Sequence, residues 1–331
     1  MKDLQIRERL KKYRMILRIA AAAILIVLPN TISSSYITGI ICKLLIYTIL
    51  AGSLNVVCGY CDMFCLGHMA FYCIGAYTAA ILTTRTDLPY WLVLLLGGIL
   101  AAMAGFVVFF PIRNLSGAWL SLVTIGFSEI VRLTALNWTG LTGGPMGIKD
   151  IPRPSFFGLT ISNNKMFYYL FLVFAAMFLF MTSRIVKSRV GYAWLSIKED
   201  KLAAASLGVE VTRYKLMNFL YATFWAGIAG ALFAPFLQFI DSSLFVVDEG
   251  FSVLCMILIG GLGTIIGPVA GSIIVITLTE VLRFLANYRM VMYGIVIMLM
   301  MWIRPQGIFG KSINGMSKSF GHKIRQKRRS T

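Results

Sequence analysis

Apolar stretches long enough to cross a bilayer recur along most of this chain, separated by short polar connections. An α-helix needs about 20 apolar residues to cross the hydrocarbon core. Lipid cannot satisfy backbone hydrogen bonds, so only helices or a closed barrel span it, and continuous apolar runs favour helices. We therefore predict an all-α, polytopic integral membrane protein with about ten transmembrane helices, near residues 15–33, 37–57, 64–83, 90–110, 118–136, 167–183, 216–236, 250–266, 269–286 and 290–303.

Composition and charge placement support this prediction and suggest an orientation. The 331 residues are 58% hydrophobic and only 13% charged, with a mean hydropathy of +0.80, which excludes an ordinary soluble domain. The net charge of +18 would suggest nucleic acid in a soluble protein, but 22 of the 31 Lys and Arg lie in three blocks, 1–18, 184–215 and 304–331. Ten spans place all three blocks on one side, as the positive-inside rule expects of cytoplasmic segments. We predict a multi-pass protein of a bacterial-type cytoplasmic (inner) membrane, with both termini cytoplasmic and no nucleic-acid partner.

Three segments follow from this topology. Residues 1–14 form a basic cytoplasmic segment, residues 15–310 the transmembrane domain, and residues 311–331 a basic tail held near anionic membrane lipid. The last span is short, and the Gly-rich region Gly260–Gly271 would fit a broken or re-entrant segment. Eight complete spans with re-entrant pieces are therefore the alternative.

A polar segment from Ser188 to Lys215 interrupts the apolar sequence and contains its own signals for a helix start and a helix end. Ser196 precedes Glu199 by three residues, the spacing of a capping box at a helix start. Gly208 supplies a stop where a left-handed residue is needed. We predict a short helix on the cytoplasmic side that serves as a docking element.

Ionisable residues within spans are costly and suggest function. Glu129 with Arg132, and Glu280 with Arg283, are each spaced to pair on one helical face. The pairs would line a gate or pathway, or hold helices in register. Val123–Ala135 also aligns with Ile274–Ala286, which would make a parallel internal repeat.

His68 lies in a Gly- and Ala-rich helix, where it would pack near a translocation path or relay protons. Lys43, near a membrane edge, is expected to snorkel. Cys61, Cys65 and His68 would share one helical face, but small residues packing closely explain them better than a metal site. The predicted outer loops contain no Cys, so no disulfide framework is implied.

Enzymatic chemistry has no support in the sequence. No nucleophile–base pair or paired carboxylate site is present, and GLGTIIGP lacks the Lys and Ser/Thr of a nucleotide-binding loop. We expect no catalytic residue, metal or cofactor on this chain. The long outer connection, Asn137–Lys165, is rich in Gly and Pro and predicts a fixed, turn-rich loop. It would receive a soluble partner or cap the helices.

Six motifs follow one another along the chain. They are LGHMAFYCIGAYTA (66–79), GAWLSLVTIGFSEIVRL (117–133), LTGGPMGI (141–148), SRVGYAWLSIKEDKLAAASLGV (188–209), IGGLGTIIGPVAGS (259–272) and RPQGIFG (304–310). This ordered set, within about Leu54 to Gly310, resembles the permease subunits of branched-chain amino acid ABC importers. The family pattern differs at Cys61, Asp62 and Cys65, which precede the Leu-Gly-His step, and at Met146.

This resemblance implies a non-enzymatic subunit that forms the translocation path for branched-chain or other aliphatic amino acids. Its expected partners are a second homologous permease, cytoplasmic ATP-binding subunits and an extracytoplasmic solute-binding protein. A relative that imports urea or short amides, or an ion-coupled secondary transporter, is the alternative. The implied sites are ATPase coupling at Arg189, Gly191, Glu199, Asp200 and Gly208, a path or gate at His68, Phe71, Glu129, Arg132, Glu280 and Arg283, and an outer loop at Thr142, Gly143 and Gly144.

Overall fold

The computed structural model describes residues 29, 34–156, 159–161, 163–281, 283, 288–304 and 307–310. The described chain is helical apart from one antiparallel hairpin of two short strands, which confirms the all-α prediction. The longer helices are α2 (Ser35–Cys61), α3 (His68–Arg85), α4 (Tyr90–Ile112), α5 (Gly117–Asn137), α7 (Asn164–Val186), α10 (Val211–Leu237), α11 (Val247–Gly260), α12 (Gly267–Val281) and α13 (Arg289–Ile303). The shorter elements are α6 (Thr139–Thr142), η1 (Gly144–Met146), β1 (Ser155–Phe156), β2 (Leu159–Thr160), α8 (Arg189–Glu199), α9 (Lys201–Ser206) and η2 (Ser242–Phe245).

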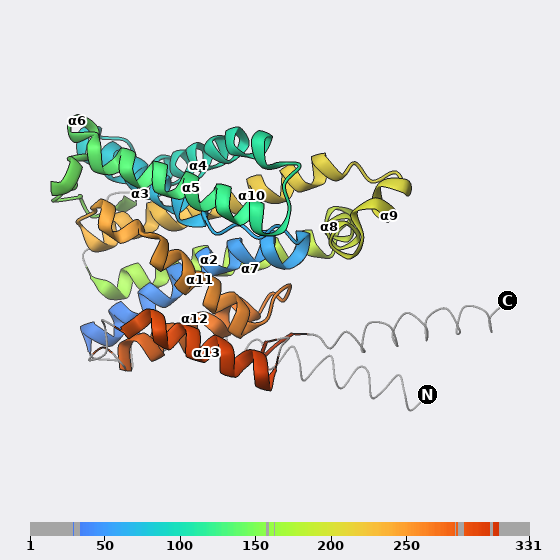
Figure 1. The fold of residues 1–331 in the computed structure, drawn as a ribbon. Coiled ribbons are helices and arrows are strands. Elements are labelled where there is room, and N and C mark those ends of the chain that lie inside the picture. Colours follow the sequence, from blue (N-terminus) through green and yellow to red (C-terminus); the bar gives the residue numbers. More distant parts are fainter. Residues whose placement is uncertain are drawn as a thin grey trace, which may run out of the picture.

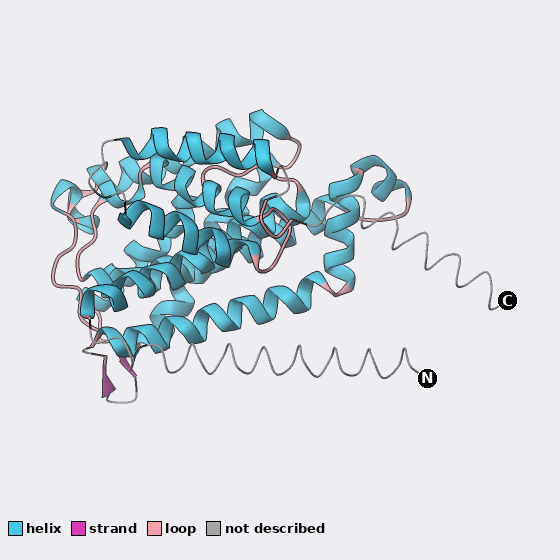
Figure 2. Ribbon diagram, turned by 90° about the horizontal axis from the view of Figure 1, so that it is seen from below, coloured by secondary structure: helices cyan, strands magenta, loops and turns pink. Residues whose placement is uncertain are grey.

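The longer helices run up and down along one common direction and form a bundle (Figure 1). Consecutive helices are therefore joined alternately at two ends. One end carries α8 and α9, which project beyond the bundle, and we call it the α8–α9 end (Figure 1). The opposite end carries α6, and Figure 2 shows the β-hairpin at that same end. We call it the α6 end.

Helices α2, α3 and α10 form the centre of the bundle, where small residues allow backbones to touch. A Cβ atom at Gly75 in α3 would overlap the carbonyl oxygen of Gly227 in α10, and one at Gly230 would overlap the carbonyl oxygen of Tyr72. This close approach is the usual way helices associate in membranes, where apolar burial alone gives no driving force. Phe71 and Trp225 are fully buried, and their rings contact Phe219 of α10 and Phe178 of α7, respectively.

Helices α4, α5 and α7 form the periphery and leave apolar side chains exposed. Phe110, Trp119 and Phe180 are among the exposed large residues of these three helices. Five described helices, α2, α4, α5, α7 and α10, are long and apolar enough to cross a membrane. A multi-pass membrane protein follows from this finding, whereas the number of crossings stays a prediction.

The short helix α11 corrects the predicted span 250–266, while α12 covers the described part of the predicted span 269–286, whose last residues lie largely outside the described residues. The structure has 14 and 15 residues in these helices, or about 21 and 22 Å at about 1.5 Å per residue. Helix α11 ends at Gly260 because Gly261 adopts φ +114, which a residue with a side chain rarely takes. The Gly-rich region is thus a turn between two short antiparallel helices. The first predicted span, 15–33, lies outside the described residues except for Pro29.

Candidate functional site

The α8–α9 segment, residues 189–208, is fixed to the bundle by its first helix. Trp194 is buried, and its Nε1 donates a hydrogen bond to the carbonyl oxygen of Tyr214 in α10 (2.9 Å). Gly191 lies so close to the end of α7 that a Cβ atom would overlap the carbonyl oxygen of Val186. One face of α8 is therefore anchored, and the segment beyond it projects from the bundle.

The predicted capping box is wrong. Ser196 and Glu199 both lie inside α8, which begins seven residues before Ser196, and the Ser196 hydroxyl donates to the carbonyl oxygen of Tyr192 (2.9 Å). The break comes at Asp200, whose Oδ1 accepts hydrogen bonds from the backbone nitrogens of Leu202 (2.8 Å) and Ala203 (3.0 Å). Asp200 is thus the N-cap of α9. The packing of Trp194 keeps α8 helical through the position where the spacing predicted a start.

Gly208 is confirmed as the stop of this segment. Its φ is +84, and the next amide, of Val209, donates to the carbonyl oxygen of Ala204 (3.1 Å). This bond is the long closure of a Schellman-type helix end. The second residue after α9, Gly208, is therefore left-handed, a conformation that glycine adopts without strain.

Two leucines on this polar segment were missed by sequence reasoning. Leu202 is 79% exposed and Leu207 is 84% exposed, and Tyr192 on α8 is also exposed. Large apolar side chains on a polar, projecting segment suit burial by a partner. Their signal in the sequence was weak, because leucines in a helical segment ordinarily indicate its buried face.

His68 and Phe71, predicted to line a path, are buried in the bundle. The His68 Nε2 lies 2.7 Å from the Ser53 hydroxyl of α2. The Phe71 ring contacts Phe127 of α5 and Phe219 of α10, each with 5.6 Å between centroids. These contacts join α2, α3, α5 and α10, so both residues have a packing role in this conformation.

The predicted common face of Cys61, Cys65 and His68 is wrong. Cys61 ends α2, Cys65 lies in the connection, and His68 begins α3, so the three do not lie on one helix. No group of three His, Cys, Asp or Glu residues that could hold a metal occurs within the described residues. All six cysteines are buried as free thiols.

The Glu129–Arg132 pair forms as predicted, on the exposed face of α5. Arg132 Nε lies 3.0 and 2.9 Å from the two carboxylate oxygens, and its Nη2 also contacts Oε1. The Glu129 side chain is 37% exposed and that of Arg132 is 21% exposed, next to the exposed apolar Ile130. A carboxylate on an apolar membrane surface is expensive, so protein or water is expected to cover it.

Glu280 also pairs with Arg283, at 3.8 Å, and accepts a hydrogen bond from the Tyr36 hydroxyl. This pair does not repeat the α5 arrangement. Glu129 and Arg132 both lie inside α5, whereas Glu280 lies in the last described turn of α12 and Arg283 lies outside the described helix. Figure 1 shows α5 and α12 on opposite sides of α11, and the two predicted gate pairs are not brought together.

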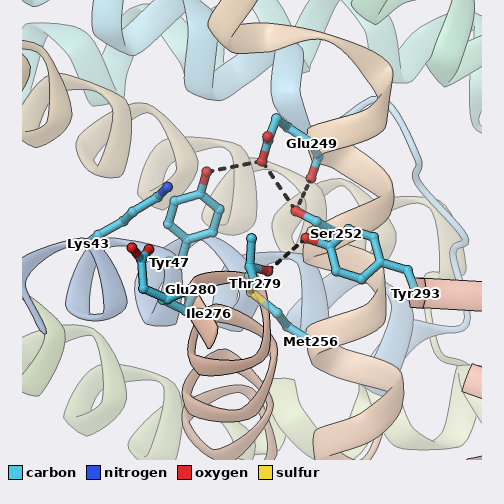
Figure 3. Close-up of a pocket in the computed structure, with 9 residues that line it drawn as sticks. All are labelled: Lys43, Tyr47, Glu249, Ser252, Met256, Ile276, Thr279, Glu280 and Tyr293. Carbon is cyan, nitrogen blue, oxygen red and sulfur yellow. Dashed lines mark hydrogen bonds between the residues drawn. The ribbon is translucent and has the colours of Figure 1, made fainter. Parts of the chain in front are cut away.

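Glu280 contributes to a small polar pocket toward the α6 end (Figure 3). The cavity volume is about 30 Å³, which is room for about two water molecules. Lys43 directs its ammonium into it, 5.7 Å from the ring centre of Tyr47. The Tyr47 hydroxyl donates to Glu249 Oε2 (3.3 Å), a carboxylate that sequence reasoning missed. The lining residues are Lys43, Tyr47, Glu249, Ser252, Met256, Ile276, Thr279, Glu280 and Tyr293.

The described part of the long connection at the α6 end is turn-rich, as predicted. The Thr142 hydroxyl donates to the carbonyl oxygen of Ala135 (2.6 Å), and Gly143 and Gly144 adopt φ +75 and +57. Backbone hydrogen bonds between Ile148 and Ile240 (2.9 and 3.0 Å) tie the loop to the end of α10. These contacts hold residues 142–148 against α5 and against the residues that follow α10.

Comparison with known proteins gives a consistent result. Residues 36–301 match the family model described as branched-chain amino acid transport system / permease component. The chain is 37% identical over 287 residues to the high-affinity branched-chain amino acid transport system permease protein LivM of Salmonella typhimurium and of Escherichia coli, covering 80% of this chain and 68% of each relative. It is 27% identical over 199 residues to the autoinducer 2 import system permease protein LsrC of Salmonella paratyphi B, covering 56% and 54%. No solved structure matches the chain significantly.

Proposed function

Because the chain belongs to the family of permease components of branched-chain amino acid transport systems, we propose that it is the membrane-spanning subunit of an ATP-driven importer. Its solutes are branched-chain or other aliphatic amino acids. The chain acts with a second homologous permease, cytoplasmic ATP-binding subunits and an extracytoplasmic solute-binding protein. It is not itself an enzyme and carries no cofactor.

The observation that carries this proposal is the projecting α8–α9 segment with its exposed leucines. Asp200 and Gly208 bound α9, and Leu202 and Leu207 offer apolar surface to a partner. Arg189, the first residue of the segment, and Glu199, before the break, are exposed charged residues of the same segment. In our proposal this segment docks on an ATP-binding subunit, and its movement drives the spans on either side.

The membrane topology is proposed on the same basis. With ten spans, the α8–α9 end faces the cytoplasm together with both termini, and the α6 end faces outward. The Thr142–Gly144 turn then lies where a solute-binding protein arrives. The exposed face of α5 around Glu129 and Arg132 faces the second permease or a water-filled path, which removes the cost of exposing charge to lipid.

Uptake measured in proteoliposomes tests the proposal. The complex, reconstituted with both permeases, the ATP-binding subunits and the solute-binding protein, is expected to accumulate labelled leucine only when ATP is supplied. Accumulation of leucine without ATP or without the ATP-binding subunits would contradict the proposed energy source. Accumulation of urea but not leucine would contradict the proposed solute.

Docking is tested separately with Leu202→Ser combined with Leu207→Ser. Each buried leucine is worth at least about 1.5 kcal/mol, so the ATP-binding subunits are expected to bind about a hundredfold more weakly. Leu88→Ser, which removes an exposed leucine at the α6 end, is the matched control. Equal binding by the double variant and the control would exclude this segment as the docking surface.

A further inference from the structure

A partly buried polar junction lies where the α8–α9 segment meets the bundle. Lys198, in the last turn of α8, donates a hydrogen bond from Nζ to the carbonyl oxygen of Gly59 (2.7 Å). Gly59 lies in the last turn of α2, where carbonyl groups have no partner within the helix. A cation at that position also interacts favourably with the negative end of the helix dipole. The contact therefore favours a charged donor such as an ammonium or guanidinium group.

The same end of α2 holds the turn between α11 and α12. Asn55 lies one helical turn before Gly59 and is 2% exposed. Its Nδ2 donates to the carbonyl oxygen of Thr264 (2.8 Å), and its Oδ1 accepts from the backbone nitrogen of Gly263 (2.9 Å). Both hydrogen-bonding groups of one buried amide are thus used to hold one turn.

Backbone contact closes the junction. A Cβ atom at Gly59 would overlap the backbone nitrogen of Gly263, and one at Gly263 would lie 3.6 Å from the Nζ of Lys198. Beyond the turn, the amides of Ile308 and Phe309 donate to the carbonyl oxygens of Ile259 and Gly260 (2.9 and 3.0 Å). Four segments therefore meet at one place. They are the end of α8, the end of α2, the α11–α12 turn and residues 308–309.

Breaking this junction would leave the buried amide of Asn55 without its partners. A buried donor or acceptor that loses its partner costs roughly 1–3 kcal/mol. A displacement of α8 that keeps the hydrogen bonds intact therefore moves the end of α2 and, through Asn55, the α11–α12 turn. The α11–α12 pair reaches from this junction to the polar pocket toward the α6 end, where Glu249 and Glu280 lie. The junction thus connects the projecting segment to helices that line a pocket toward the opposite end.

We propose that Lys198 and Asn55 are positioning residues of the transport cycle, which transmit movement of the α8–α9 segment to α2 and to the α11–α12 pair. This inference rests on the proposed function, because movement of α8 and α9 is driven by the ATP-binding subunits. Neither residue touches solute or nucleotide in this role. A junction that only stabilised the fold would affect assembly instead, and the two roles are separable by experiment.

The test compares Lys198→Met with Lys198→Arg in the fully assembled complex. Methionine keeps the side-chain stem and removes the donor, whereas arginine keeps a charged donor. Leucine uptake and ATP hydrolysis are measured in the same proteoliposomes, and assembly is measured by co-purification. We expect Lys198→Met to assemble and hydrolyse ATP while its uptake per ATP falls about tenfold, within the usual range of coupling between sites, and Lys198→Arg to restore most of it.

Asn55→Leu, which removes both hydrogen bonds to the turn, is expected to give the same phenotype. The double variant is expected to be no worse than the more severe single variant, because the two residues act through one junction. Unchanged uptake per ATP in Lys198→Met would overturn the inference, and so would a loss of assembly that accounts for all lost uptake. A wild-type complex without ATP-dependent uptake would overturn the proposed function as well, so the two failures are distinguishable.

Discussion

At the scale of single residues, the glycines of the central helices decide how closely the bundle packs. Gly75→Ala would place a methyl group on the carbonyl oxygen of Gly227, so α3 and α10 must separate. Overpacking of this kind typically costs about 1–3 kcal/mol. We expect the purified protein to unfold at a lower temperature than the wild type, measured by the fluorescence of its tryptophans in detergent.

Gly126→Ala is the matched control for this prediction. Gly126 lies within α5, but no described atom outside its own helix backbone lies within 4 Å of its Cβ position. Alanine is the better helix former, so this variant is expected to match or exceed the stability of the wild type. Equal lowering of the unfolding temperature by both substitutions would show that the close approach of α3 and α10 at Gly75 does not determine the stability of the bundle.

Residue pairs within one helix could be predicted from the sequence, and pairs across the fold could not. The Glu129–Arg132 ion pair follows from a three-residue spacing, and the structure has it. The contact of Lys198 with Gly59 joins residues far apart in the chain, and no local pattern encodes it. Glu249 was missed for the same reason, since its partner Tyr47 comes from another helix.

At the scale of secondary-structure elements, the α8–α9 segment predicts different effects for substitutions at Asp200, which caps α9, and at Ser196, which lies inside α8. Asp200→Ala removes the side chain that caps α9, which typically costs about 1 kcal/mol. Backbone amides of residues 203–206 are then expected to exchange hydrogen about fivefold faster, as local opening becomes easier. Ser196→Ala should leave those rates unchanged, because its hydroxyl bonds within α8. If hydrogen exchange became faster in Ser196→Ala and not in Asp200→Ala, the capping box predicted at Ser196 would be supported instead.

The apolar runs of the sequence predicted where the long helices lie, but they did not predict where several of these helices end. The predicted spans 118–136 and 216–236 lie inside α5 and α10, because each apolar run is long and bounded by polar residues. The ends of α11 and α12 depend on the conformation of Gly261 and on tertiary contacts of the turn. A capping motif likewise indicates only a possible helix start. Here the buried Trp194 anchors α8, which continues through Ser196.

At the scale of the whole molecule, the connections alternate between two ends, so exposed residues at each end should face opposite sides of the membrane. Trp138, next to α6, is 55% exposed, and Leu207, after α9, is 84% exposed. The six native cysteines are buried and should give little background labelling. Single substitutions Trp138→Cys and Leu207→Cys therefore report on the two ends independently.

A membrane-impermeant maleimide applied to intact spheroplasts is expected to label Trp138→Cys and not Leu207→Cys. Inside-out vesicles from cells that lack the ATP-binding subunits should give the reverse, because Leu207 is then uncovered and the basic segment around α8 and α9 remains on the cytoplasmic side. Labelling after denaturation measures the total cysteine and controls for expression. Labelling of both variants from one side would contradict an alternating bundle. A clean reversal would keep the bundle but invert its orientation, and the α8–α9 segment could then no longer meet a cytoplasmic ATP-binding subunit.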